Sequence, residues 1–201
     1  MYVVDDDDAV RHSVIGLLES ADLNAIGFSS AEAFLQHRFE ELPSCVILDM
    51  QLPAISGFEV ADALKDSGRE IPIIFLTGHG TIPMSVRAIK GGAYEFLTKP
   101  VESGALIDAI ESALRLAEHN AVRNKEHYAL KQRHMSLTPR EHEVLTLAIS
   151  GMLNKQIAAE LGVSEITVKV HRRRVMEKMQ VRSVAELVRA VERLTKSQPS
   201  E

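Results

Sequence analysis

Residues that could carry phosphate or metal chemistry follow short apolar runs in the first half of the chain. The run Val46-Ile47-Leu48 leads directly into Asp49, and Pro53 then breaks the pattern. A short apolar segment bounded by turn residues is typical of a buried parallel strand. Ligands of open α/β sheets bind just outside the carboxyl ends of the strands, so Asp49 is placed for chemistry. The alternative is an aspartate that only stabilises a turn.

Four more strands are expected in the first 120 residues. Short apolar runs indicate them at residues 2–4, 25–28, 71–76 and 93–97, and helical periodicity or capping-box sequences lie between the strands. This alternation predicts an α/β fold with a doubly wound, five-stranded parallel sheet. Polar residues that follow the strands converge at one edge of such a sheet: Asp5, Asp6, Asp49, Thr77 and Lys99.

Three carboxylates at one edge repel one another and need a cation at neutral pH. Oxygen ligands suit Mg²⁺, and the absence of a His or Cys cluster in the sequence argues against a softer metal. A carboxylate beside Mg²⁺ and a lysine can attack a phosphoryl group and form an acyl phosphate. The metal and Lys99 would stabilise the charge on the transferring oxygens.

This set of motifs resembles the receiver domain of bacterial two-component response regulators, and the continuation Gly78-His79-Gly80 is similar to the FixJ branch. The resemblance covers residues 1 to about 117 and rests on four motifs: Asp5-Asp6, Asp49 with Pro53, Thr77-Gly78 and Lys99-Pro100.

The resemblance implies that Asp49 is the phosphoacceptor and that a sensor histidine kinase is the phosphoryl donor. Asp5, Asp6, Asp49 and the backbone carbonyl of Gln51 would bind Mg²⁺. Thr77 would be the switch hydroxyl, and Lys99 would pair with the phosphate. The peptide bond between Lys99 and Pro100 would be cis.

Activation is expected to change the surface of the receiver. Phe96 takes the position of an aromatic switch residue, although an ordinary strand side chain is an equal alternative. The altered surface around Val86, Lys90 and Phe96 would let two receivers dimerise.

The 201 residues carry a net charge of −5, unevenly distributed. Residues 1–120 hold 8 Lys+Arg and 19 Asp+Glu, whereas residues 121–201 hold 15 and 9. A basic second part favours a nucleic-acid partner for that part alone. The sequence contains neither a long apolar span nor a signal-like N-terminus, so we expect a cytoplasmic protein without a membrane partner.

Helical spacing continues past residue 117, and residues 118–135 are expected to be a helical linker. Its later part either pairs with a second copy as a weak coiled coil or stays a solvated single helix.

The basic segment, residues 136–201, has the signals of a small all-α helix-turn-helix domain. Thr138-Pro139-Arg140-Glu141 predicts a helix start, and Gly162 separates helices expected at 154–161 and 165–179. On the later helix, Lys169, Val170 and Arg173 are expected to face outward, where a major groove could accept them. A merely solvated basic face is the alternative.

Three sequence runs, at 137–141, 154–158 and 167–171, closely resemble the LuxR-type output domain of the NarL/FixJ response regulators. The resemblance implies that helix 165–179 reads DNA through Lys169, Val170 and Arg173, while Asn154 and Lys155 contact the DNA backbone. It also implies a dimer contact on the last helix through four apolar residues: Val184, Leu187, Val188 and Val191.

We therefore interpret the chain as a DNA-binding transcriptional regulator switched by phosphorylation, and not as an enzyme. An aspartyl-phosphate phosphohydrolase would need a second acid where Gln51 stands. The chain could instead be an adaptor that binds no DNA, or a receiver that no longer uses phosphate.

Overall fold

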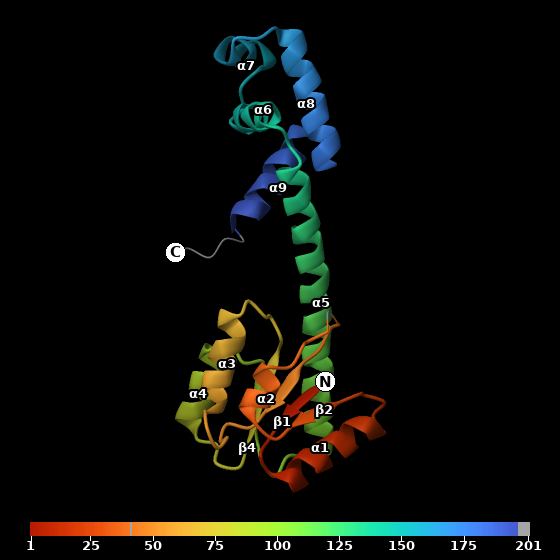
Figure 1. Ribbon diagram of the computed structural model, residues 1–201, viewed down its shortest axis with the longest axis vertical. Coiled ribbons are helices and arrows are strands. Elements are labelled where there is room, and N and C mark those ends of the chain that lie inside the picture. Colours follow the sequence, from red (N-terminus) through yellow and green to blue (C-terminus); the bar gives the residue numbers. More distant parts are fainter. Residues whose placement is uncertain (41, 197–201) are drawn as a thin grey trace. The chain divides into compact units, whose positions relative to one another are not determined.

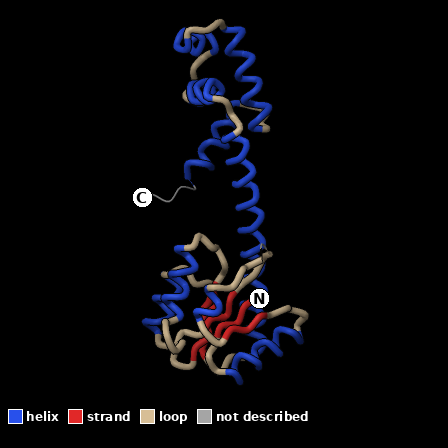
Figure 2. Tube along the Cα trace, in the orientation of Figure 1, coloured by secondary structure: helices blue, strands red, loops and turns tan. Residues whose placement is uncertain are grey.

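The computed structural model describes residues 1–40 and 42–196. Its first part is a sheet of five strands, all paired in parallel, in the order β2-β1-β3-β4-β5 (Figure 2). The strands are β1 Tyr2–Val4, β2 Ile26–Phe28, β3 Val46–Leu48, β4 Ile73–Thr77 and β5 Glu95–Thr98. The predicted fold class, a doubly wound five-stranded parallel sheet, is confirmed.

Helices cover both faces of this sheet (Figure 1). They are α1 Asp8–Ser20, α2 Ala31–Leu35, α3 Gly57–Asp66, α4 Ile82–Lys90 and the first turns of α5 Ser103–Met135. On one face, Val46 and Leu48 pack with residues of α2, α3 and α4, and on the other Ile47 packs with residues of α1 and α5. Successive strand residues point to opposite faces. Strand β3 is therefore apolar at every position because both of its faces are buried.

Local capping signals set the helix starts. The hydroxyl of Ser56 accepts from the backbone N–H of Glu59, whose carboxylate accepts from the N–H of Ser56, as its sequence predicts for α3. The carboxylate of Asp7 accepts from the backbone N–H groups of Ala9 and Val10 at 2.8 and 3.1 Å and caps α1. These side chains satisfy N–H groups that a helix start leaves unpaired.

The described residues form two compact units that divide between Val122 and Arg123. Helix α5 runs unbroken over 33 residues and contributes to both. The second unit adds α6 Pro139–Ile149, α7 Asn154–Leu161, α8 Glu165–Met179 and α9 Val184–Lys196. Gly162 ends α7 with a φ of 64°, a left-handed conformation that glycine adopts without steric cost. The expected helix-turn-helix is thus present as α7 and α8.

Two small apolar clusters hold the second unit together. Leu145, Val175 and Met179 form one with parts of α9, and Val144, Ile157 and Val168 form the other between α6, α7 and α8. Among the described helices, none combines the length and apolar character that crossing a membrane requires.

Candidate functional site

Lys99 connects two carboxylates at the carboxyl edge of the sheet. Its Nζ donates to Oδ2 of Asp5 at 2.6 Å and to Oδ2 of Asp49 at 2.7 Å. Asp6 adds a third, exposed carboxylate, and one oxygen of each aspartate lies within 4.8 Å of the others. The convergence predicted for the ends of β1, β3 and β5 is thus observed for all four side chains.

Burial makes these charges interdependent. Asp5 and Asp49 are buried. Burial raises the pKa of Asp5, although hydrogen bonds from Lys99 and from the backbone N–H of Asp7 act in the opposite direction. Burial also opposes the charge of Lys99, but the hydrogen bonds with Asp49 and Asp5 raise the Lys99 pKa overall. Lys99 is therefore a cation at neutral pH, and the carboxylates around it favour a further cation.

Backbone N–H groups orient the two buried carboxylates. The N–H of Asp7 donates to Oδ1 of Asp5 at 3.0 Å, and the N–H of Gln51 donates to Oδ1 of Asp49 at 3.1 Å. The backbone N–H of Gln51 thus fixes the Asp49 carboxylate, and each aspartate keeps an oxygen toward Lys99.

Gly57 and Arg11 also shape this edge, and the sequence analysis missed both. A Cβ on Gly57 would lie 2.6 Å from the carbonyl oxygen of Asp49, so only glycine lets α3 start this close. Arg11 donates through Nη1 to the carbonyl oxygen of Asp5 at 2.8 Å and pairs with the carboxylate of Asp8. The spacing of Asp8 and Arg11, three residues apart at a helix start, was the available signal for the second contact.

Thr77 and Phe96 lie on neighbouring strands. Thr77 is fully buried, and its Oγ1 accepts from the backbone N–H of His79 at 3.3 Å. Phe96 is half-buried and packs against the core on the α3–α4 face. The Lys99–Pro100 bond is cis, as expected. The switch roles of Thr77 and Phe96 stay predictions.

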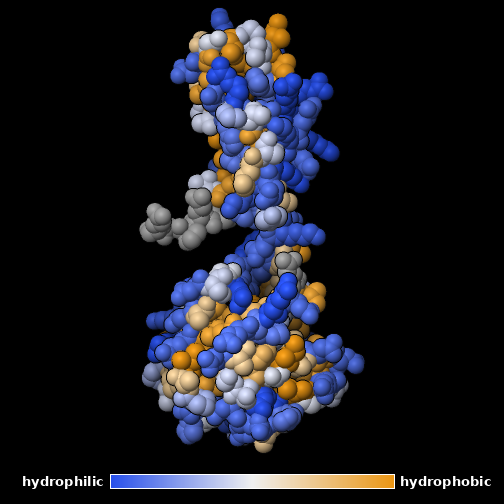
Figure 3. Space-filling view, viewed as in Figure 1, coloured by the Kyte–Doolittle hydropathy of each residue, from blue (hydrophilic) through white to orange (hydrophobic). Residues whose placement is uncertain are grey.

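The outward face of α8 carries exposed basic side chains, in contrast to the acidic edge of the receiver sheet. Lys169, Val170 and Arg173 are exposed, while the face opposite them buries Val168 and Val175. The nearest charge partners come from the same helix: Lys169 lies 3.5 Å from Glu165, and Arg173 lies 2.7 Å from Glu177. In Figure 3 the surface over α8 is largely hydrophilic. Basic side chains of this kind remain available for a partner.

Asn154 and Lys155 start α7. Lys155 is exposed, whereas Asn154 is half-buried and its Oδ1 accepts from Nη1 of Arg172 at 2.6 Å. The side chain of Asn154 therefore connects α7 to α8 in this structure. His171 is half-buried on α8.

The residues expected at dimer contacts differ in exposure. Val86 and Lys90 are exposed on α4, where Ile82 and Ile89 are exposed as well. On α9, Leu187 is buried in the domain's own core, Val191 packs against that core, and Val184 and Val188 are half-buried. Leu187 is thus not on the surface where the sequence analysis expected it, because the inward stripe of α9 includes position 187.

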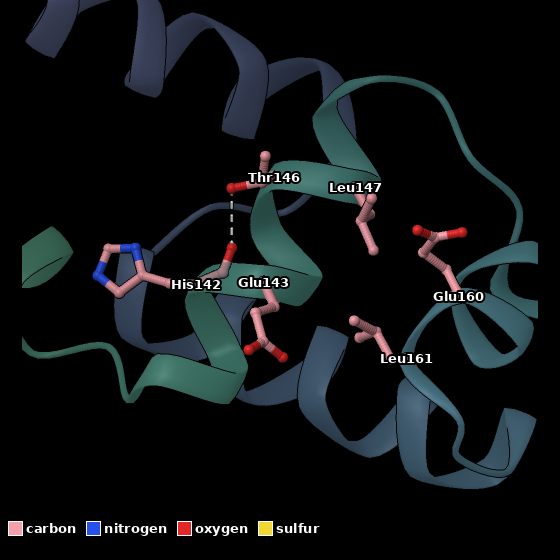
Figure 4. Close-up of a pocket in the computed structure, with 6 residues that line it drawn as sticks. All are labelled: His142, Glu143, Thr146, Leu147, Glu160 and Leu161. Atoms are coloured by element: carbon pink, nitrogen blue, oxygen red, sulfur yellow. Dashed lines mark hydrogen bonds between the residues drawn. The ribbon is translucent and has the colours of Figure 1, made fainter.

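A hollow of about 430 Å³ lies between α6 and α7 in the second unit. In Figure 4, Leu147 and Leu161 point toward each other, Glu143 and Glu160 flank them, and the His142 ring points away. Carboxylates disfavour an approaching phosphate backbone. This side of the domain is therefore distinct from the basic face of α8.

Comparisons with known proteins agree with both units. Residues 1–111 match the response regulator receiver domain, and residues 135–191 match the bacterial regulatory proteins of the luxR family. The response regulator protein TodT of Pseudomonas putida is 46% identical over 197 residues, which cover 98% of this chain and 87% of TodT.

Two further matches extend over nearly the whole length. The transcriptional regulatory protein FixJ of Bradyrhizobium diazoefficiens is 42% identical over 193 residues, covering 94% of this chain and 92% of FixJ. The low-resolution structure of response regulator StyR is 49% identical with a TM-score of 0.82, covering 95% of this chain and 96% of that one. The family assignment rests on the receiver fold with its acidic edge, on the helix-turn-helix unit, and on relatives that share this arrangement. The chain belongs to the NarL/FixJ family of two-component response regulators, transcription regulators with a receiver and a LuxR-type DNA-binding domain.

Proposed function

We propose that this response regulator is switched by transfer of a phosphoryl group from a sensor histidine kinase to Asp49. The observation that carries the proposal is the position of Lys99, whose Nζ hydrogen-bonds both Asp5 and Asp49. A single ammonium between a nucleophilic carboxylate and a metal-binding carboxylate is suited to hold the oxygens of an incoming phosphoryl group.

The acidic residues fit a magnesium ion. Three carboxylate oxygens, from Asp5, Asp6 and Asp49, lie within 4.8 Å of one another, and all are the oxygen donors that Mg²⁺ prefers. We assign the metal to these three side chains and to the backbone carbonyl of Gln51. Bound Mg²⁺ would supply positive charge to the phosphoryl oxygens.

The chain's own residues perform the transfer. An oxygen of Asp49 forms a bond to phosphorus, the bond from phosphorus to the imidazole nitrogen of the kinase breaks, and that nitrogen keeps the electron pair. Lys99 donates to a phosphoryl oxygen, and the Thr77 hydroxyl turns from its contact with the His79 N–H to donate to another. The acyl phosphate adds about −1.5 to −2 charges to this edge of the sheet.

This added charge is the signal that reaches DNA. Movement of Thr77 and Phe96 favours a receiver surface around Val86 and Lys90 that pairs with a second copy. Pairing brings two output domains to adjacent half-sites in double-stranded DNA.

The output domains would then contact DNA and each other. Lys169, Val170 and Arg173 approach base edges, and Asn154 and Lys155 contact the backbone. On α9 the dimer contact rests on Val184 and Val188, with Leu187 and Val191 supporting them from within the core.

Intact mass and sedimentation, measured after addition of Mg²⁺ and acetyl phosphate, test the switch. Wild type should gain one phosphoryl group and change from monomer to dimer, and Asp49→Asn should do neither. Dimerisation and DNA binding of Asp49→Asn as strong as those of the phosphorylated wild type would contradict the proposal. Asp62→Asn, which changes an exposed acid of α3, is the matched control and should be phosphorylated normally.

A further inference from the structure

Helix α8 exposes an aliphatic side chain one turn before the residues expected at the base edges. Ile166 is 74% exposed, and Val170, four residues later, is 44% exposed. Side chains at positions i and i+4 of a helix lie one above the other, so the two form a continuous apolar strip. Arg173 continues the same face, opposite the buried Val168 and Val175.

The position of Ile166 in the helix limits what this strip can contact. It is the second residue of α8, directly after the N-cap Ser164 and Glu165. In helix-turn-helix proteins the N-terminal residues of the second helix meet base edges in the major groove. An isoleucine forms no hydrogen bond with a base or a phosphate, and the only apolar group on the major-groove edges is the C5-methyl group of thymine.

We propose that Ile166 is a specificity-determining residue that contacts a thymine methyl group in each half-site. This inference depends on the proposed binding of DNA through α8 and adds a ligand to it. Val170 extends the same contact to a neighbouring base pair. The cations Lys169 and Arg173 provide attraction to phosphates or guanines. Ile166 provides discrimination in favour of the thymine methyl group, which a cation could not provide.

The experiment replaces thymine by uracil, which removes only the methyl group. Duplexes are first selected from a random library with the full-length chain in the presence of Mg²⁺ and acetyl phosphate. Each thymine of the selected site is then replaced in turn. Burial of one methyl group corresponds to about a fourfold change in affinity. Wild type should therefore lose about fourfold at the thymine beneath Ile166 in each half-site.

The variant Ile166→Ala completes the test. It should bind the thymine and uracil duplexes equally at that position and still discriminate at positions read by other residues. The control Val122→Ala shortens another exposed β-branched residue, in α5, and should behave as wild type. Circular dichroism checks that both variants fold.

Two results are informative in different ways. Specific binding that ignores every uracil replacement, or an Ile166→Ala variant that still distinguishes thymine from uracil there, would overturn the role of Ile166 and leave DNA binding intact. Failure to select any sequence would instead overturn the sequence-specific binding on which the inference rests.

Discussion

The edge of the receiver sheet around Asp49 and the outward face of α8 are both rich in charge, but they hold it differently. At the Asp49 edge, Lys99 bonds to carboxylates 94 and 50 residues away, and both of these carboxylates are buried. On the outward face of α8, Lys169 and Arg173 each pair with a glutamate four residues away, and the side chain of Arg173 is 81% exposed.

This contrast fits the two proposed roles, phosphoryl transfer at the Asp49 edge and DNA binding at the outward face of α8. Buried charges whose partners come from different strands are already oriented, so little rearrangement is needed when a phosphoryl group arrives. Exposed pairs within one helix are weak and screened by salt, so they exchange readily for phosphates of DNA. Substitutions should therefore act on chemistry and packing in the receiver, and on affinity in α8.

Removal of the shared cation should have the largest effect. Lys99→Met leaves Asp5 and Asp49 without their shared ammonium group. It also removes the positive charge that would stabilise the phosphoryl oxygens. We expect the rate of Asp49 phosphorylation by acetyl phosphate to fall at least about 100-fold, the usual cost of removing one charge-stabilising donor. Intact mass followed over time measures this. Lys65→Met, on an exposed turn of α3, should react like wild type, and an unchanged rate in Lys99→Met would exclude a direct role for the ammonium.

A methyl group beneath Asp49 should be the next largest change. Gly57→Ala would place a Cβ 2.6 Å from the Asp49 carbonyl oxygen, and this contact cannot relax without backbone movement. We expect the free energy of unfolding of the receiver to fall by about 2–3 kcal/mol, measured by urea titration. Gly16→Ala in α1 meets nothing within 4 Å and should instead gain up to about 1 kcal/mol. Equal effects of the two substitutions would mean that Gly57 is not closely packed.

A smaller effect is expected at the ion pair between Lys178 and the buried Glu141 of the output domain. Lys178 donates to the Glu141 carboxylate at 2.7 Å, and Glu141 is 2% exposed. Lys178→Met should lower the free energy of unfolding of α6 and α8 by about 1–2 kcal/mol at pH 7, because the buried Glu141 carboxylate loses its cationic partner. The effect stays modest because the Lys178 side chain is partly exposed to solvent. Amide hydrogen exchange in the two helices measures it.

The same pair predicts a pH dependence. The hydrogen bond from Lys178 holds the pKa of Glu141 below its ordinary value. Its contribution is therefore complete above the ordinary glutamate pKa of about 4.3 and is lost as the pH falls through the lowered value. The difference between wild type and Lys178→Met should shrink below about pH 4. A difference that grew in acid would mean that the pair does not act through the ionised carboxylate.

The smallest effect on stability belongs to the exposed face. Arg173→Ala breaks only its pair with Glu177, so the unfolding midpoint should stay where it is in wild type. Affinity for selected DNA should nevertheless fall about tenfold, since a base-edge or phosphate contact is lost. Fluorescence anisotropy over a range of salt concentrations measures this. Arg189→Ala on α9 is the control, and an equal loss there would indicate nonspecific attraction.

Much of the fold was predictable because its signals are local. The apolar run before Asp49, the capping residue Thr138 and the turn at Gly162 each act over a few residues, and each lies where the sequence analysis expected it. The convergence of Asp5, Asp49, Thr77 and Lys99 followed from one topological rule, that parallel strands end at the same edge.

The parts that were not predictable depend on contacts between distant segments. Gly57 resembles any glycine in a capping sequence until α3 is placed against the Asp49 backbone. Leu187 fits an exposed stripe on α9 until that helix packs on α8 residues such as Val175. Asn154 is a residue type that often contacts phosphates, but in this structure its Oδ1 accepts a hydrogen bond from Arg172.

Hydrophobic periodicity, capping residues and turn residues lie within each segment, so they indicate which elements form and which side chains reach the carboxyl edge. The pairing of those side chains depends instead on the tertiary structure. Lys99 lies between Asp5 and Asp49 because the strand order places β1 beside β3 and β5 beside β4, and hydrogen bonds over such separations depend on packing that no local pattern encodes.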